Sequence, residues 1–166
     1  MAAGNTYIAL ATNTLSSSAA SVTFSSISGA YTDLVLICNA IGVGQANFTL
    51  QFNGDTASNY SSTVLSGDGT TATSFRYTTA TALKCFNSGQ ALNVRWGTFI
   101  ANIQNYTNTT TSKSVLMRFG SGGYEVDVGA GLWFATSAAI TSVTIASTGN
   151  NYDTGSTFQL FGIAAA

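Results

Sequence analysis

The chain of 166 residues contains no proline and no histidine, and only 7% of its residues are charged. An average soluble protein has about 25% charged residues, and charge normally keeps a freely diffusing monomer from associating with itself. Here the polar residues are mostly Ser, Thr, Asn and Gly, which form a neutral surface that still hydrogen-bonds water. This composition favours a protein that is fixed in an assembly, with much of its surface against other subunits.

The missing histidine limits the chemistry that the chain can perform. Ser-His-Asp and Cys-His arrangements are excluded, and so are histidine-ligated metals. A phosphate-binding loop of the Walker type and a dinucleotide fingerprint after a strand are also absent. The sequence therefore predicts a protein that is not an enzyme, with no catalytic residue, no metal and no cofactor.

Charge runs and long apolar runs are absent as well. Five basic and six acidic residues give a net charge of −1 without a basic stripe, so the electrostatic signature of nucleic-acid binding is missing. No apolar run is long enough to span a bilayer. The N-terminal stretch MAAGNTYIALATNT lacks a positive region followed by a long apolar block. We expect no nucleic-acid partner, no membrane partner, and cytoplasmic synthesis without a signal peptide.

Short β-rich runs separated by turn residues make up the chain, and no window has a helical period. Roughly ten or eleven such runs follow one another at the spacing of an antiparallel sandwich or barrel. In NFTLQF, for example, Phe48, Leu50 and Phe52 share one face. The sequence predicts an all-β antiparallel β-sandwich, jelly-roll-like. Residues 1–18 are expected to form an N-terminal arm or a first edge strand, and residues 19–166 a single sandwich domain.

Two runs, LVLIC at 34–38 and GLWFA at 131–135, are apolar on both faces of the expected strand. The outer faces of a sandwich are normally polar, and contiguous exposed apolar patches mark interfaces. We therefore expect a second protein surface to cover the extra apolar residues.

The stretch LQFNGDTASNYSSTVLSGDGT, residues 50–70, raises the question of a calcium loop. A calcium loop needs several converging carboxylates and a bidentate Glu, whereas Asp55 and Asp68 lie in separate segments without a following Glu. FNGD after an alternating run is a strong hairpin signal, and SGDGT is typical of a glycine-rich turn. We interpret the stretch as two tight turns that join strands.

Glu125 and Asp127, in GGYEVDVG, lie two residues apart and so share one face of a strand. Two carboxylates about 5–9 Å apart can hydrolyse glycosides. No third polar group or aromatic platform is recognisable beside them. We interpret them instead as a solvated or subunit-facing strand edge, where charge blocks edge pairing.

Aromatic residues form the other candidate site. Tyrosines that stack on sugars would indicate a carbohydrate-binding module. We favour the interpretation that they close the sandwich ends and interfaces and keep their hydroxyls in water. Trp96 and Trp133 are expected to be core or interface anchors. The tyrosines concerned are Tyr60, Tyr77, Tyr106, Tyr124 and Tyr152.

Cys38 and Cys85 can pair only if their Cα atoms lie within about 7 Å, and cytoplasmic synthesis disfavours a disulfide. We expect two buried thiols. The polar segment 105–114, NYTNTTTSKS, is either a functional loop or a long hairpin connection. Glycosylation sequons are attributed to chance in a chain rich in Ser, Thr and Asn; they begin at Asn47, Asn59, Asn105 and Asn108.

Several segments resemble a small β-domain of structural proteins in tailed bacteriophages. They are FNGDTASNYSSTVLSGDG, GTFIANIQNYTNTTTSKSVLMRFG, GLWFATSAAITSVTI and GSTFQLFGI, within about Gln51 to Ile163. Proteins with this domain occur as stand-alone virion proteins and as parts of fibre-like proteins. Shaft repeats and coiled-coil heptads are absent ahead of the domain, which favours a small protein docked on a larger surface.

The resemblance implies a virion structural protein made in the host cytoplasm. We expect a capsid-exterior cement or decoration protein that stabilises the head. Its expected partners are copies of itself, as a homotrimer, and the major capsid protein or another virion protein. The trimer is inferred from the virion setting, where three-fold positions are common. The alternatives are a tail or baseplate fibre tip that binds a host receptor, a carbohydrate-binding module and, least favoured, a glycosidase.

Overall fold

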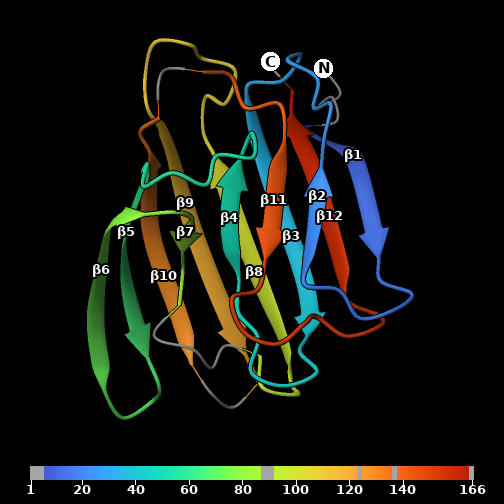
Figure 1. Cartoon of the computed structure of the whole chain (residues 1–166), viewed down its shortest axis with the longest axis vertical. Helices are drawn as coiled ribbons and strands as arrows, with labels where there is room; N and C mark the ends of the chain where they lie inside the picture. Colours follow the sequence, from blue (N-terminus) through green and yellow to red (C-terminus); the bar gives the residue numbers. More distant parts are fainter. Residues whose placement is uncertain (1–5, 87–91, 123–124, 136–137, 165–166) are drawn as a thin grey trace.

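The structure, a computed structural model, describes residues 6–86, 92–122, 125–135 and 138–164. These residues form twelve β-strands and no helix, arranged as two antiparallel sheets that pack face to face (Figure 1). The predicted all-β antiparallel sandwich is confirmed. No proline interrupts a strand, because the chain has none.

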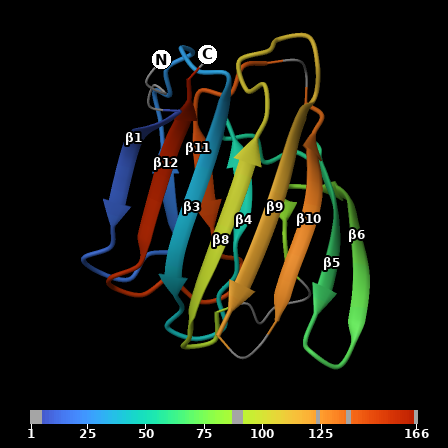
Figure 2. The ribbon, with the colours of Figure 1, turned by 180° about the vertical axis from the view of Figure 1, so that it is seen from behind.

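The larger sheet has eight strands, seen from behind in Figure 2. Their order is β1 (Tyr7–Thr14), β12 (Thr157–Ile163), β3 (Asp33–Ile41), β8 (Trp96–Ile103), β9 (Lys113–Ser121), β10 (Val126–Trp133), β5 (Tyr60–Gly67) and β6 (Ala72–Ala80). The smaller sheet has the order β2 (Ser21–Phe24), β11 (Val143–Ala146), β4 (Thr49–Phe52) and β7 (Leu83–Lys84).

The strand order divides the molecule into two regions. The first, which we call the body, contains β1-β12-β3-β8 of the larger sheet and β2-β11-β4 of the smaller sheet, so that strands from the two ends of the chain alternate; β7, at the edge of the smaller sheet, contacts β5 and β10. In the second, which we call the extension, β9, β10, β5 and β6 widen the larger sheet to eight strands. The jelly-roll form of the prediction stays a prediction, since the strands divide into eight and four.

The core lies between the two sheets and is strongly aromatic. Phe48 stacks on Phe99 with ring centroids 5.0 Å apart and on Tyr152 at 5.5 Å. Toward the extension, Phe52 packs against Trp133 at 5.6 Å. These rings join the smaller sheet to the larger one, because they come from strands or loops of both layers.

The first apolar run, LVLIC, lies in β3 and is covered mainly by the chain itself. Leu34, Leu36 and Cys38 point into the core with no exposed surface. On the opposite face Val35 is also buried, beside Phe161 of β12. A second protein is therefore not needed to bury this run.

The described part of residues 1–18 contains β1, which forms one edge of the larger sheet. It pairs with β12 along its length, with an irregularity in register between Ala9 and Ala11. Directly after β1, Leu15 is buried and its amide donates to the Ser156 carbonyl at 2.9 Å. This segment is thus tied into the sheet rather than extended from it.

The two tight turns predicted in residues 50–70 are present, but only one makes a hairpin. SGDGT joins β5 to its neighbour β6, with Gly69 at φ 90°. FNGD turns with Asn53 at φ 53° and Gly54 at φ 67°, yet it leads from β4 of the smaller sheet to β5 of the larger sheet. The hairpin prediction for FNGD is wrong, because β4 pairs with β11 and β7.

Candidate functional site

Strand β10 carries its polar residues inside the molecule and its apolar residues outside. Its outward positions Val126, Val128 and Leu132 are 66%, 54% and 43% exposed. The inward positions are small or acidic until Trp133, which is buried. The inward residues of this segment are Glu125, Asp127, Gly129, Gly131 and Trp133.

Close packing explains why the glycine face of β10 points inward. A Cβ atom on Gly131 would lie 2.7 Å from Leu83 Cδ2 and 3.1 Å from Met117 Cε. The next inward side chain, Trp133, is fixed because its indole N–H donates to Asp55 Oδ2 at 2.7 Å. A slip of one residue would exchange the two faces of the strand and would drive a side chain into Leu83. The register therefore leaves the valines outside.

Neighbouring strands enlarge this apolar strip into a patch on the outer side of the larger sheet. Val128 pairs with Leu65 of β5, and Ala130 pairs with Leu116 of β9. Leu65 and Leu116 are 58% and 48% exposed. We call the outer side of β9, β10, β5 and β6 the extension face. Its exposed large apolar residues are Leu65, Leu116, Val126, Val128 and Leu132.

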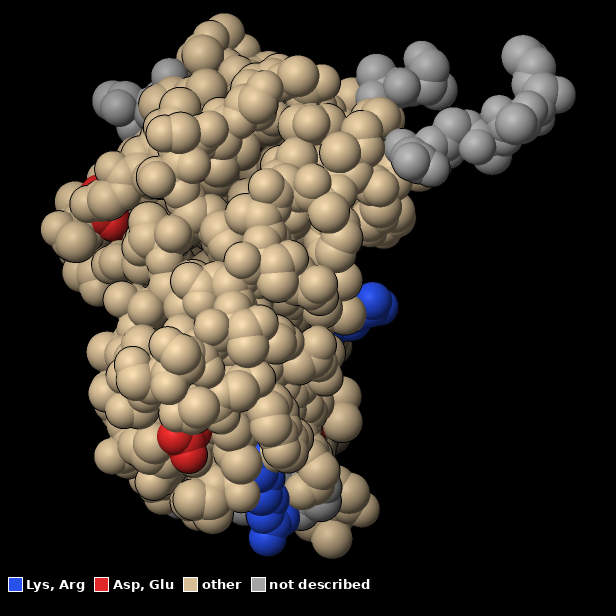
Figure 3. Space-filling model, turned by 90° about the vertical axis from the view of Figure 1, so that its right-hand side faces the viewer, with Lys and Arg blue, Asp and Glu red and all other residues tan. Residues whose placement is uncertain are grey.

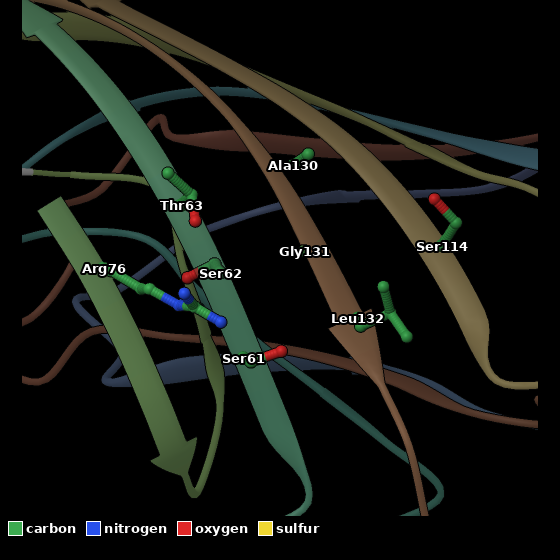
Figure 4. Close-up of a pocket in the computed structure, with 8 residues that line it drawn as sticks. All are labelled: Ser61, Ser62, Thr63, Arg76, Ser114, Ala130, Gly131 and Leu132. Carbon is green, nitrogen blue, oxygen red and sulfur yellow. The ribbon is translucent and has the colours of Figure 1, made fainter. Parts of the chain in front are cut away.

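Two shallow hollows indent the extension face, with volumes of about 290 and 590 Å³. In the first, shown in Figure 4, Arg76 reaches from β6 over β5, and Ser114 and Leu132 lie beyond it. The second is formed by β5, β6 and β10 around Leu65 and Val128. Neither hollow is lined by an aromatic side chain, so neither offers a stacking platform for a sugar.

The extension face carries positive charge only. Arg118 points outward from β9 and Arg76 from β6, and no carboxylate points outward from these four strands. Among the residues that the structure describes, neither guanidinium has a hydrogen-bond or ion-pair partner. Charge is sparse elsewhere too: Figure 3 shows a few separate basic and acidic side chains among mostly uncharged ones.

Glu125 and Asp127 do not lie at a solvated strand edge, and that interpretation is wrong. β10 is paired on both sides, with β9 and with β5, and both carboxylates point into the interior. Burial, reinforced by the charge of Asp127, raises the pKa of Glu125 to about 7 even though the Ser66 hydroxyl bonds the carboxylate. Burial and the charge of Asp127 also raise the pKa of Cys85 to about 12. The two carboxylates therefore form a coupled buried pair.

This acidic pair has little access to a substrate. Asp127 has no exposed surface and Glu125 is 8% exposed, so a sugar cannot reach between them in this structure. Within the described ranges, no group of three or more Cys, Asp or Glu residues lies close enough to hold a metal ion. The pair therefore does not present an open site.

Asp55 and Asp68 each stabilise a turn. Desolvation works against ionisation of Asp55, but hydrogen bonds from Trp133, Asn59 and the Ala57 amide outweigh it and lower the pKa of this carboxyl. For Asp68, hydrogen bonds from the amides of Thr71 and Thr70 and from the Thr70 hydroxyl lower the pKa. Both carboxylates are used inside their own loops and do not converge.

The tyrosines do not form a surface site, and the expectation that their hydroxyls stay in water is wrong for three of them. Tyr60, Tyr106 and Tyr152 have no exposed surface. Their hydroxyls donate to backbone carbonyls, of Asp55 at 3.0 Å, of Ser28, and of Asn47 at 2.7 Å, respectively. Tyr77 is partly buried and its hydroxyl donates to the Phe86 carbonyl at 2.9 Å. Tyr124 lies outside the described residues.

The two tryptophans differ in their environment. Trp133 is buried in the core, where its ring stacks on Tyr60. Trp96, at the start of β8, is 54% exposed. Both were expected to be core or interface anchors; the core role is confirmed for Trp133, and an interface role for the exposed Trp96 stays a prediction.

The remaining candidate residues have structural roles. Cys38 and Cys85 are buried free thiols, as expected. Segment 105–114 connects the paired strands β8 and β9, so it is a hairpin connection. Lys113 ends it, with its ammonium donating to the carbonyls of Asn108 and Thr111. Of the sequon residues, Asn47 is buried and bonds Thr148.

Comparison with known proteins gave no matching family model, no matching curated protein and no matching solved structure. In the described part of the chain there is no helix with the length and apolar character needed to cross a membrane. The extension face is consequently the feature from which a function is argued.

Proposed function

We propose that this chain is a non-enzymatic structural protein that works by binding another protein surface through its extension face. The observation that carries this proposal is the reversed alternation of β10, with Val126, Val128 and Leu132 in water and Asp127 in the interior. Contiguous apolar patches on monomers mark interfaces. Each square ångström of apolar surface removed from water contributes about 25 cal/mol, so covering this patch favours association.

The exposed valines and leucines are not required by the fold itself. Threonine is also favoured in strands, and the outer side of β8 in the body alternates Trp96 and Ile100 with Thr98 and Asn102. Five of the ten exposed large apolar residues in the described part of the chain lie on the extension face, where neighbouring strands bring them together. A function in docking accounts for this concentration.

Within this proposal, the protein is a component of a tailed-bacteriophage virion, a capsid-exterior cement or decoration protein. Copies of the chain form a homotrimer that binds the major capsid protein or another virion protein. The support for this setting is the resemblance of residues 51–163 to the phage β-domain and the low charge of the chain, 7%. Several docking faces in one oligomer bind a shell by avidity, so each contact can be weak.

A tail or baseplate fibre tip is the alternative that the same resemblance supports. A carbohydrate-binding module has less support, because Tyr60, Tyr106 and Tyr152 are buried and the two hollows of the extension face are not lined by aromatic residues. A glycosidase is disfavoured by the burial of Asp127.

The test is to locate the protein and to perturb its face. Antibody against the purified protein should detect it in gradient-purified phage particles, and electron microscopy should show it on the head. Leu65→Ser combined with Val128→Ser should remove it from particles, whereas Thr98→Ser, on the outer side of the same sheet in the body, should not. Absence from particles contradicts the virion setting, and unchanged incorporation of the double variant contradicts the role of the face.

A further inference from the structure

We infer that the occupant of the extension face is a different protein, whose contacting surface sets acidic side chains among apolar ones, and not the same face of a second copy of this chain. The inference rests on the proposed function, because it names the partner of the same face. The observation behind it is that the only charged side chains of this face are two arginines.

The two arginines bracket the apolar centre of the face. Arg118 pairs with Val128, which pairs with Leu65. Two residues further along β10, Ala130 pairs with Thr63, which pairs with Arg76. Adjacent strands lie about 4.8 Å apart, so the Cα atoms of the two arginines are roughly 15 Å apart with the patch between them.

This arrangement requires a partner that supplies carboxylates. A guanidinium whose surroundings become apolar on docking loses water, and leaving it unpaired costs free energy. A carboxylate accepts two parallel hydrogen bonds from a guanidinium, which both stabilises and orients the contact. Since neither Arg76 nor Arg118 has a partner within the described residues, both are available for such bonds. Complementary charge therefore selects an acidic apolar partner.

Two copies of the chain that dock through this same face do not meet this requirement. In a two-fold symmetric interface, the same patch is present on both sides. Two extension faces would bring together four arginines and no carboxylate, because no acidic residue points outward from β9, β10, β5 or β6. Pairing of two extension faces is therefore disfavoured, whereas the contacts of the proposed trimer join two different surfaces of the chain and do not require such pairing.

Two synthetic peptides test the inference on the purified protein. Both alternate Val or Leu with a charged residue over nine positions; one has Asp at the charged positions and the other has Lys, and each carries a fluorescein label. Fluorescence anisotropy at low salt should show the Asp peptide binding at least about tenfold more tightly than the Lys peptide, about 1.4 kcal/mol. The double variant Arg76→Glu with Arg118→Glu should reverse the preference.

Control variants separate the possible outcomes. Arg95→Glu changes the same kind of charge off the face, just before β8, and should leave the preference intact. If both peptides bind equally tightly and Val128→Ser abolishes this binding, the inference of an acidic partner is contradicted, but the proposed docking function of the face is not. Self-association that is lost in Val128→Ser makes a second copy the occupant and also overturns the inference. No peptide binding, with particle incorporation unchanged in Val128→Ser, contradicts both proposals.

Discussion

Strand β8 of the body and strand β10 of the extension belong to one sheet but alternate in opposite senses. β8 directs Phe99 and Ile103 into the core and Thr98 to the outside, whereas β10 directs Asp127 inward and Val128 outward. The two regions share their hydrogen-bonded ladder through β9. The comparison teaches that in β8 the hydrophobic effect decides which face is buried, while in β10 the space around two glycines decides it.

The division of labour follows from this difference. The aromatic core extends under both regions, because Phe99 comes from the body and Phe119 and Trp133 come from strands of the extension. The extension also has an outer surface whose large apolar residues are exposed. If the comparison is correct, substitutions in the body should act on stability, and substitutions on the extension face should act on binding.

The largest effect is expected from the core of the body. Phe99→Ala removes a ring that stacks on Phe48 and should lower the free energy of unfolding by about 3–5 kcal/mol, because it leaves a cavity. Denaturant unfolding followed by fluorescence measures the change. A loss below about 1 kcal/mol would mean that the aromatic core is not the main source of stability.

The buried carboxyl pair should make the extension sensitive to pH. The folded chain holds the pKa of Glu125 at about 7, above its ordinary value of 4.5. Between pH 4.5 and about 7 the folded chain binds more protons than the unfolded chain. The contribution of Glu125 to the free energy of unfolding is therefore fully present below pH 4.5. It is lost as the pH rises to about 7 and changes little above that.

Glu125→Gln removes this titration. The difference is at most about 3.5 kcal/mol, since one pKa unit corresponds to about 1.4 kcal/mol. Between pH 4 and pH 8 the melting temperature of the natural chain should fall, whereas that of the variant should change less. The variant should therefore be relatively more stable at pH 8. Parallel curves for both proteins would show that the carboxyl of Glu125 is not buried as described.

The glycine that sets the register of β10 should not tolerate a side chain. Gly131→Ala places a methyl group 2.7 Å from Leu83 Cδ2 and should destabilise the fold by about 1–3 kcal/mol through overpacking. Gly67→Ala in the adjacent strand is the matched control, because nothing lies within 4 Å of its Cβ position. Equal effects of the two variants would argue against packing as the cause of the reversed alternation.

On the extension face the expected effect on stability is small. Val128→Ser should change the free energy of unfolding by no more than about 0.5 kcal/mol, as for other exposed positions, because the side chain is 54% exposed. Thermal melting measures this, and particle incorporation measures docking. A large loss of stability would show that the isolated chain already covers this valine.

The smallest effect, none, is expected from a chelator. Asp55 and Asp68 bond within their own turns, so removing calcium should leave the melting temperature unchanged. A ligand that bound only the folded state would shift it, by linkage of binding to stability.

Much of the fold could be predicted from the sequence, because local patterns determine it. Period-two alternation, the lack of proline and glycine-rich turns identified the strands and the β5–β6 hairpin. The hairpin prediction for FNGD was wrong because its local conformation is that of a hairpin turn, while the pairing of β4 with β11 depends on residues far along the chain. A turn signal specifies a reversal of the chain and not which sheet the next strand joins.

The candidate site was only partly predictable. The run GLWFA indicated excess apolar residues, but the opposite faces of EVDVGAGLW could not be assigned to inside and outside by hydrophobicity. The deciding contacts, Leu83 and Met117 against Gly131, come from other strands. Glycine at every second position was a signal that could have been used, because it marks a face where another element approaches closely.

The strand order of the body also affects the order in which strands can pair during synthesis. β12, the last strand in the chain, lies between β1 and β3 and pairs with both. Neither early strand can complete its ladder until residues 157–163 have left the ribosome, so the body closes only after translation of the last strand. The β5–β6 and β9–β10 neighbours of the extension pair within short stretches of chain and can form earlier, since local contacts require less loop closure. A nascent chain would thus present the paired strands of its docking surface before it has a closed core.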